Sequence, residues 1–200
     1  RPLSDERPGP VGVETTEYFY NGNNQAVRTI PGDGSSDTLS EYNELGQQIR
    51  SGLDIDGDGT LDIGETDRIS ENESYYAQDA SNDWWQVSAS KLYATAGSSV
   101  PTTNSVQKMR LTFPGSVEEG LGTLNQEQVS IDVYGNETVS RTYTDREGKT
   151  VTQVTDVPGS STGSESVTVN GLRVSSQGTT GHTTTFGYDA LERQTSVTDS

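Results

Sequence analysis

The chain has no cysteine, so it can form neither a disulfide nor a thiolate metal site. Basic residues are scarce: 13 Lys and Arg stand against 30 Asp and Glu, which gives a net charge of −17. Because phosphate groups are bound by basic patches, we expect neither nucleic acid nor an anionic membrane surface as a partner. No apolar run is long enough to span a bilayer, so we expect no membrane insertion.

Hydrophobic residues are also few, at 28% of the chain. With this net charge, such a composition is typical of disordered chains. However, nine tyrosines and two tryptophans add aromatic area, and many apolar residues alternate with polar ones. We therefore expect a folded protein, with a flexible tail at residues 1–10, where three prolines occur. The chain starts at Arg1 and shows no signal peptide, so we expect a piece of a longer polypeptide.

Strand patterns dominate the sequence, and helical periodicity is weak. Gln107, Met109, Leu111 and Phe113 alternate with polar or charged residues, which predicts a strand with one buried and one wet face. Asn170-Gly171 lies between two apolar alternating runs and is the favoured pair for a type I′ hairpin turn. The sequence therefore predicts an all-β fold of consecutive antiparallel hairpins.

The most specific motif is the acidic loop, residues 54–65, with the sequence DIDGDGTLDIGE. Its spacing matches the calcium-loop pattern D-x-D-x-D-G-x₅-E, in which Gly59 takes the sharp turn. Calcium is a hard cation that prefers oxygen ligands, and a bidentate glutamate at the last position can complete its shell. The predicted ligands are the side chains of Asp54, Asp56, Asp58, Asp62 and Glu65 and the backbone carbonyl of Thr60.

The residues around the acidic loop argue against an EF-hand, which needs a helix on each side. Gly52 precedes the loop and Gly64 lies near its end, and glycine is a poor helix former. We expect a calcium loop in a β-rich protein, anchored to a neighbouring element through the apolar Leu61 at position 8. The alternative is an acidic Asp/Gly turn that binds no ion.

A weak internal repeat runs along the chain. Each unit has an Asp or Asn, two further residues, a residue in the glycine place, and a polar or basic residue, commonly after an aromatic. Each unit is typical of a strand, a tight turn and a second strand. The second strands are predicted at 26–30, 139–143 and 150–154. The residues in the glycine place are Asn24, Gly46, Gly135, Gly148 and Glu192.

The segment from Tyr188 to Asp199, YDALERQTSVTD, resembles a unit of the bacterial RHS/YD-repeat family, and the segments that start at Tyr42 and Tyr143 resemble degenerate units. This resemblance implies hairpins in a curved sheet that forms part of a large secreted or surface shell. In many members of the family the shell encloses a C-terminal toxin or other cargo. Glu192 departs from the expected glycine, and nothing matches the family's autoprotease region.

The resemblance also suggests a division of the chain. Residues 11–52 and 115–200 are predicted to be YD-repeat-like hairpins. Residues 53–114 depart from the repeat and are predicted to be an insertion that holds the acidic loop.

Signals for catalysis are poor. His182 is the single histidine and lies in a polar run, which is typical of a solvated loop or strand edge. Residues 159–163 match G-x-S-x-G, but the run is rich in serine and glycine and follows Pro158, so we expect a flexible loop. We therefore predict no enzymatic activity.

Trp84 and Trp85 could stack on a sugar ring, whereas strand alternation favours one buried and one partly exposed tryptophan. Taken together with the resemblance, which implies a secreted or cell-surface location, the sequence predicts a structural segment with calcium as its cofactor and the rest of a parent polypeptide as its partner. The alternatives are a calcium-dependent adhesive module that binds glycan or protein, and a fibre subunit that associates through open sheet edges.

Overall fold

The computed structural model describes residues 3–9, 12–112 and 117–200. These residues form antiparallel strands, and none of them belongs to a helix that is long and apolar enough to cross a bilayer. The strands are β1 (Leu3–Gly9), β2 (Gly12–Tyr20), β3 (Ala26–Ile30), β4 (Asp37–Tyr42), β5 (Gln48–Asp54), β6 (Arg68–Gln78), β7 (Trp84–Tyr93), β8 (Thr102–Arg110), β9 (Val117–Glu118), β10 (Gly122–Ile131), β11 (Glu137–Thr144), β12 (Thr150–Asp156), β13 (Ser164–Val169), β14 (Leu172–Gln177), β15 (Thr183–Tyr188) and β16 (Gln194–Asp199).

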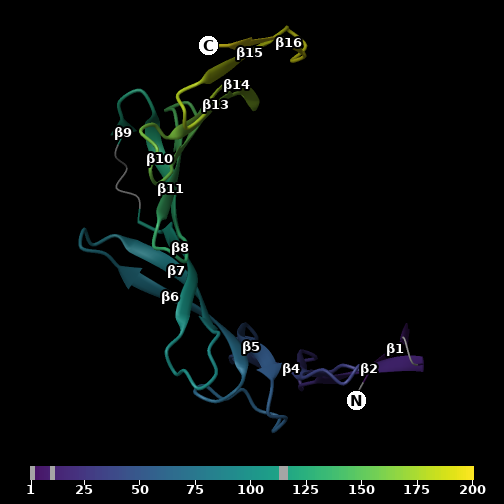
Figure 1. Cartoon of the computed structure of the whole chain (residues 1–200). Coiled ribbons are helices and arrows are strands. Elements are labelled where there is room, and N and C mark those ends of the chain that lie inside the picture. Colours follow the sequence, from purple (N-terminus) through teal and green to yellow (C-terminus); the bar gives the residue numbers. More distant parts are fainter. Residues whose placement is uncertain (1–2, 10–11, 113–116) are drawn as a thin grey trace. The chain divides into compact units, whose positions relative to one another are not determined.

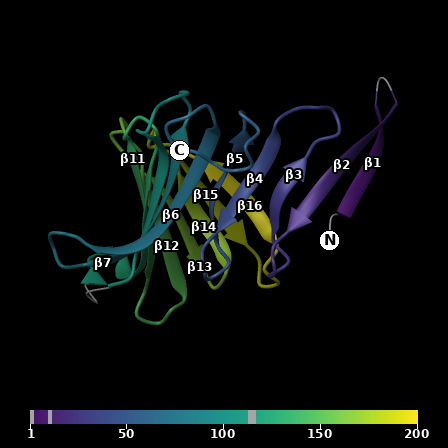
Figure 2. The ribbon, with the colours of Figure 1, turned by 90° about the horizontal axis from the view of Figure 1, so that it is seen from below.

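Strands that follow one another in the chain are neighbours in one open sheet (Figure 1). Its order runs from β1 to β16 in sequence, except that β8 pairs with β10 and the short β9 pairs with β10 alone. Figure 2 shows the same succession of hairpins from a second side. The predicted all-β fold of consecutive antiparallel hairpins is confirmed.

By their contacts the residues divide into two compact units. Unit 1 extends to residue 73 and includes 89–104, and unit 2 comprises 74–88 and 105–200. Strands β6, β7 and β8 contribute residues to both units. These three strands come from the stretch 53–114, predicted to be an insertion, and they lie on the path of the sheet between β5 and β10.

Several local predictions are confirmed. The predicted strand 26–30 is β3, and the predicted strands 139–143 and 150–154 lie within β11 and β12. Val169 pairs with Leu172, and between them Asn170 and Gly171 have φ of 50° and 85°, as a type I′ turn requires.

The beginning of the chain differs from the expected flexible tail. Leu3–Gly9 forms β1, which pairs with β2 from Leu3↔Tyr18 to Gly9↔Gly12. The side chains of residues 3–7 are exposed, so this strand is held by backbone hydrogen bonds and not by burial. The composition predicted a tail because these residues have few side chains to bury. Pairing of backbone groups between two strands needs little side-chain burial, so a strand can still form.

Strand β8 alternates as predicted, but its more buried face is the charged one. Lys108 and Arg110 are half-buried, whereas Met109 and Leu111 are 37% and 44% exposed. The reason is that Arg110 forms ion pairs across the sheet, described below. Phe113, the last residue of the predicted strand, and the predicted boundary at 114/115 lie outside the described residues.

The core of unit 1 positions the acidic loop. Leu39, Leu61, Ile69 and Tyr93 are buried together, with Leu61 contributed by the loop. Gly52 lies between Leu39 and Ile69 in the strand register. A Cβ atom on it would lie 2.4 Å from the Arg68 carbonyl oxygen and 3.1 Å from Leu61 Cδ2. Glycine therefore gives Leu61 room to approach the sheet, and the predicted anchoring through Leu61 is confirmed.

Candidate functional site

The acidic loop joins two neighbouring strands and has no flanking helix. Asp54 is the last residue of β5, β6 begins at Arg68, and Leu53 pairs with Arg68 at the base of the loop. The absence of helices that Gly52 and Gly64 predicted is confirmed for this part of the described chain. The loop thus closes a β5–β6 hairpin.

The carboxylate of Asp54 binds the backbone of the first half of the loop. Asp54 is only 2% exposed, and its two carboxylate oxygens accept hydrogen bonds from the backbone N–H groups of Gly57 and Gly59, at 2.7 and 2.9 Å. Both glycines have positive φ, 78° and 88°, which L side chains rarely adopt. The sequence places glycine at these positions, so the backbone can curl back over the carboxylate.

A second buried carboxylate, Asp67, lies beyond the twelve-residue motif. It is 3% exposed, and its oxygens accept the N–H groups of Ile55 at 2.8 Å and Asp62 at 3.0 Å. Asp67 thereby ties the start of the loop to its second half. Sequence reasoning missed this residue, because a lone aspartate before a strand has no distinctive pattern.

Three of the predicted ligands converge. One carboxylate oxygen from each of Asp54, Asp56 and Asp58 lies within 4.8 Å of the other two. Asp62 and Glu65 lie outside that group. The Thr60 hydroxyl lies 2.8 Å from an Asp58 oxygen and 2.5 Å from an Asp62 oxygen, so it links the two halves of the ligand set.

The carboxylates of the loop repel one another. The pKa of Glu65 is raised, first by the charge on Asp62 and then by that on Asp56. The pKa of Asp56 is also raised: the hydrogen bond from the Asp58 N–H lowers it, but loss of solvation and three neighbouring aspartates outweigh that bond. Oxygen donors of one sign, gathered around one point, fit a hard divalent cation such as Ca²⁺.

Unit 1 also carries a row of alternating charges across β4, β5, β6 and β7, which we call the unit 1 charge row. Arg50 lies 3.4 Å from Glu41 and 2.7 Å from Glu71, and Lys91 pairs with Glu71 at 3.9 Å and with Glu73. The strand register brings these residues together from positions far apart in the chain.

Unit 2 has a second such row, the unit 2 charge row. Its five members alternate in sign, with pair distances of 2.5, 2.8, 2.8 and 2.7 Å. In order they are Asp83, Arg110, Glu127, Arg141 and Asp156. The central Glu127 is buried and accepts from both arginines. Sequence reasoning missed both rows, since only the cross-strand register reveals them.

The turns of the predicted repeat share one geometry. The residues in the glycine place all have positive φ, between 60° and 82°. At the head of each turn an Asx side chain accepts backbone hydrogen bonds. Asn43 Oδ1, for example, accepts from Leu45 and Gln47 at 3.0 and 2.9 Å. Two preceding tyrosines donate to the neighbouring strand, Tyr42 to the Ala26 carbonyl and Tyr188 to the Arg173 carbonyl.

Two further turns with a residue of positive φ in the glycine place were missed, and only the first is headed by an Asx residue. Asp79 heads one of them, with Asn82 at φ 63° in the glycine place, and its Oδ1 accepts from Ser81 and Asp83. The spacing Asp79-x-x-Asn82 repeats that of Asn21-x-x-Asn24, so this turn could have been found. The turn from Gly178 to His182 closes through backbone bonds alone and carries no Asx signal.

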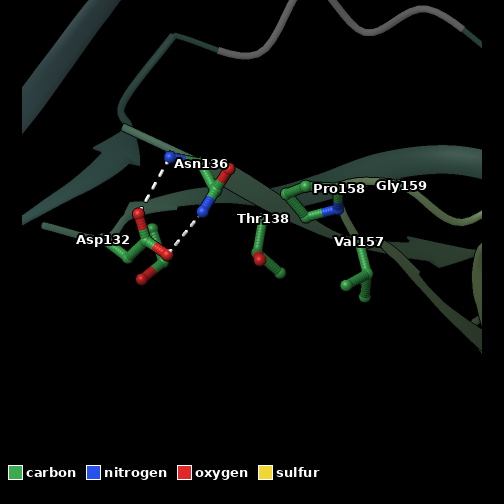
Figure 3. Close-up of a pocket in the computed structure, with 7 residues that line it drawn as sticks. Asp132, Asn136, Thr138, Val157, Pro158 and Gly159 are labelled. Atoms are coloured by element: carbon green, nitrogen blue, oxygen red, sulfur yellow. Dashed lines mark hydrogen bonds between the residues drawn. The ribbon is translucent and has the colours of Figure 1, made fainter. Parts of the chain in front are cut away.

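A polar pocket of about 440 Å³ lies beside the Asp132 turn and the Val157–Gly159 segment (Figure 3). Asp132 accepts the Asn136 N–H at 2.9 Å and the Asn136 amide at 2.8 Å. These bonds, led by the Asn136 side chain, lower the pKa of Asp132. Its carboxylate is therefore committed to the turn and is poorly suited to proton transfer.

The other predicted positions belong to unit 2. His182 is exposed, and the match at 159–163 lies in the connection between β12 and β13, without the helix that a nucleophile elbow needs. Trp84 is 47% exposed and Trp85 is half-buried. The two differ in exposure, as strand alternation predicted, but neither is buried in a core.

The sequence matches no protein-family model and no curated protein.

Proposed function

We propose that the chain is a non-catalytic structural segment of a longer, secreted or cell-surface polypeptide of the RHS/YD-repeat kind, and that calcium bound in the acidic loop stabilises it. One observation carries the proposal: three carboxylates converge in a loop whose Leu61 is part of the unit 1 core. An ion bound there would act directly on the packing of the sheet.

The ligands would be the side chains of Asp54, Asp56, Asp58, Asp62 and Glu65 and the Thr60 carbonyl. Calcium would supply the positive charge that the loop lacks. The chain's own residues provide the frame, since Asp54 and Asp67 hold the backbone of the loop through four hydrogen bonds.

The expected size of the effect follows from linkage. With calcium at about a hundred times its dissociation constant, binding to the folded state alone adds about 2.7 kcal/mol to the free energy of unfolding. A typical domain is stable by about 5–15 kcal/mol, so the contribution would be substantial.

A structural role is also supported by the rest of the chain. The repeated Asx-headed turns and the two charge rows provide order where the core is small. In a longer polypeptide such a segment would contribute to a shell or scaffold, with an enclosed C-terminal domain or other copies of the chain as candidate partners.

Thermal melting tests the calcium proposal. We expect the unfolding midpoint to fall by about 5–10 °C when calcium is replaced by a chelator, which is the shift that about 2.7 kcal/mol gives in a chain of this size. The double variant Asp58→Asn, Glu65→Gln is the control and should melt at the same temperature in both conditions. A wild-type midpoint that does not respond to the chelator would refute the proposal.

A further inference from the structure

Within unit 2, an open groove of about 380 Å³ lies over β6, β7, β8, β10 and β11. Two aromatic side chains line it, Tyr75 and Trp85, and Val87 contributes to its apolar part. Polar side chains complete the lining: Gln78, Asp79 and Lys108, with Glu137 from the start of β11. Aromatic surface with a few polar groups, in a volume of at least roughly 300 Å³, is typical of small-molecule sites.

The turn that Asp79 heads holds the Trp85 ring in place. Asp79 Oδ2 accepts a hydrogen bond from the indole N–H at 3.0 Å, while Asp79 Oδ1 accepts from the backbone of the turn. The polar tip of the indole is thus already bonded within the protein. A ring fixed before binding loses little conformational entropy when a ligand stacks on it.

Two charged side chains of the groove, Lys108 and Glu137, are available to a ligand. Among residues 3–9, 12–112 and 117–200, neither Lys108 nor Glu137 takes part in an ion pair. Lys108 supplies hydrogen-bond donors and Glu137 acceptors. The Gln78 amide already donates to the Asn82 carbonyl at 3.0 Å, and it can still offer its oxygen and its second N–H. Charges of both signs with an amide favour a neutral polyhydroxyl ligand, and the net charge of −17 disfavours an anionic one.

The groove lies over the sheet, and residues from five strands line it. A ligand in the groove therefore meets side chains that project from the sheet face. A sugar suits them, because it presents apolar C–H faces to aromatic rings and hydroxyl groups to charged and amide side chains.

We propose that the Tyr75–Trp85 groove binds a neutral oligosaccharide, stacked on the two aromatic side chains and hydrogen-bonded by Gln78, Lys108 and Glu137. The groove shares no residue with the acidic loop, so the test of this proposal does not depend on calcium binding.

The test uses the full chain in calcium-containing buffer and a panel of neutral hexasaccharides built from glucose, mannose, xylose or N-acetylglucosamine. Binding is followed by tryptophan fluorescence and titration calorimetry. We expect at least one member to bind. Tyr75→Ala should weaken it by about tenfold or more, which corresponds to the loss of one good aromatic contact. Tyr76→Ala is the matched control, since Tyr76 is 67% exposed and does not line the groove.

Variants of the adjacent Trp84 and Trp85 test which tryptophan contacts the ligand. Trp84→Phe should keep the fluorescence change on binding, and Trp85→Phe should lose it, while circular dichroism verifies that both variants are folded. The proposal is overturned if no panel member binds. It is also overturned if Tyr75→Ala and Tyr76→Ala bind equally well, or if the signal comes from Trp84.

Discussion

The acidic loop in unit 1 and the charge row in unit 2 each gather five carboxyl or guanidinium groups, but with opposite results. In the loop all five side chains are acidic, and their charges raise the pKa of Glu65. In the unit 2 charge row the signs alternate, and each neighbour pair lies 2.5–2.8 Å apart. Each carboxylate of the row is paired with an arginine of the chain itself, whereas the loop, under the calcium proposal, takes its cation from solution.

The comparison shows two ways to order a sheet with little apolar core. A charge row ties strands together through partners encoded in the sequence, so it should be insensitive to calcium. The acidic loop ties β5 to β6 and to the Leu61 cluster, and its contribution should depend on the concentration of the ion.

The largest effect is expected from Glu127→Gln in the unit 2 charge row. Glu127 is buried between Arg110 and Arg141, and loss of its charge leaves both guanidinium groups without their shared partner. We expect a loss of about 3 kcal/mol in the free energy of unfolding, with or without calcium. Urea denaturation measures it. The control Glu147→Gln removes an exposed pair with Lys149 and should change stability by less than about 0.5 kcal/mol.

Leu61→Ala tests the connection between the loop and the core. Leu61 is 7% exposed among Leu39, Ile69 and Tyr93, so its truncation should cost about 2–3 kcal/mol and also weaken calcium binding. Denaturation and calcium titration measure the two effects. Leu45→Ala is the control, because Leu45 is 85% exposed in a turn. If Leu61→Ala binds calcium with unaltered affinity, calcium binding in the loop is not coupled to packing of the core.

A smaller effect of opposite sign is expected in a turn that uses neither device. Glu192 has φ 63°, where the related turns have Gly or Asn. Glu192→Gly should stabilise the protein by about 0.5–1 kcal/mol, independently of calcium, because it removes the strain of a left-handed conformation. The reverse change, Gly148→Ala at φ 72°, should destabilise by a similar amount in the same denaturation assay.

The smallest expected change is in how the stability of the protein falls at acidic pH. Hydrogen bonds lower the pKa of Asp132 below its ordinary 3.8, so its contribution is present above about pH 4 and is lost as the pH falls through the lowered value. Asp132→Asn should leave stability at pH 7 nearly unchanged and make the loss below pH 4 shallower, since Asn43 heads an equivalent turn. Identical acid unfolding of the variant and the wild type would contradict this assignment.

Local features of the fold were predictable, and features that depend on strand register were not. The turns at Asn24, Gly46 and Gly148 follow from spacing over five residues, because one left-handed residue and one Asx acceptor define them. The face of β8 was not predictable. Met109 is more hydrophobic than Arg110, but the partners that draw Arg110 inward come from other strands.

The same distinction holds for the candidate site. The motif located the acidic loop, its glycines and the anchoring Leu61, since these lie within twelve consecutive residues. Asp67 was missed although it is more buried than Asp56 or Asp58, because its role depends on how the loop closes. The groove at Trp85 likewise needed the register of five strands.

Amide hydrogen exchange with and without calcium compares the two regions in one experiment. The N–H groups of Gly57 and Gly59, which are bonded to Asp54, should gain about a hundredfold in protection when calcium is raised to a hundred times its dissociation constant. Amides of β10, β11 and β12, around Glu127, should exchange at unchanged rates. Equal rates for Gly57 and Gly59 in both conditions would contradict a calcium-dependent loop.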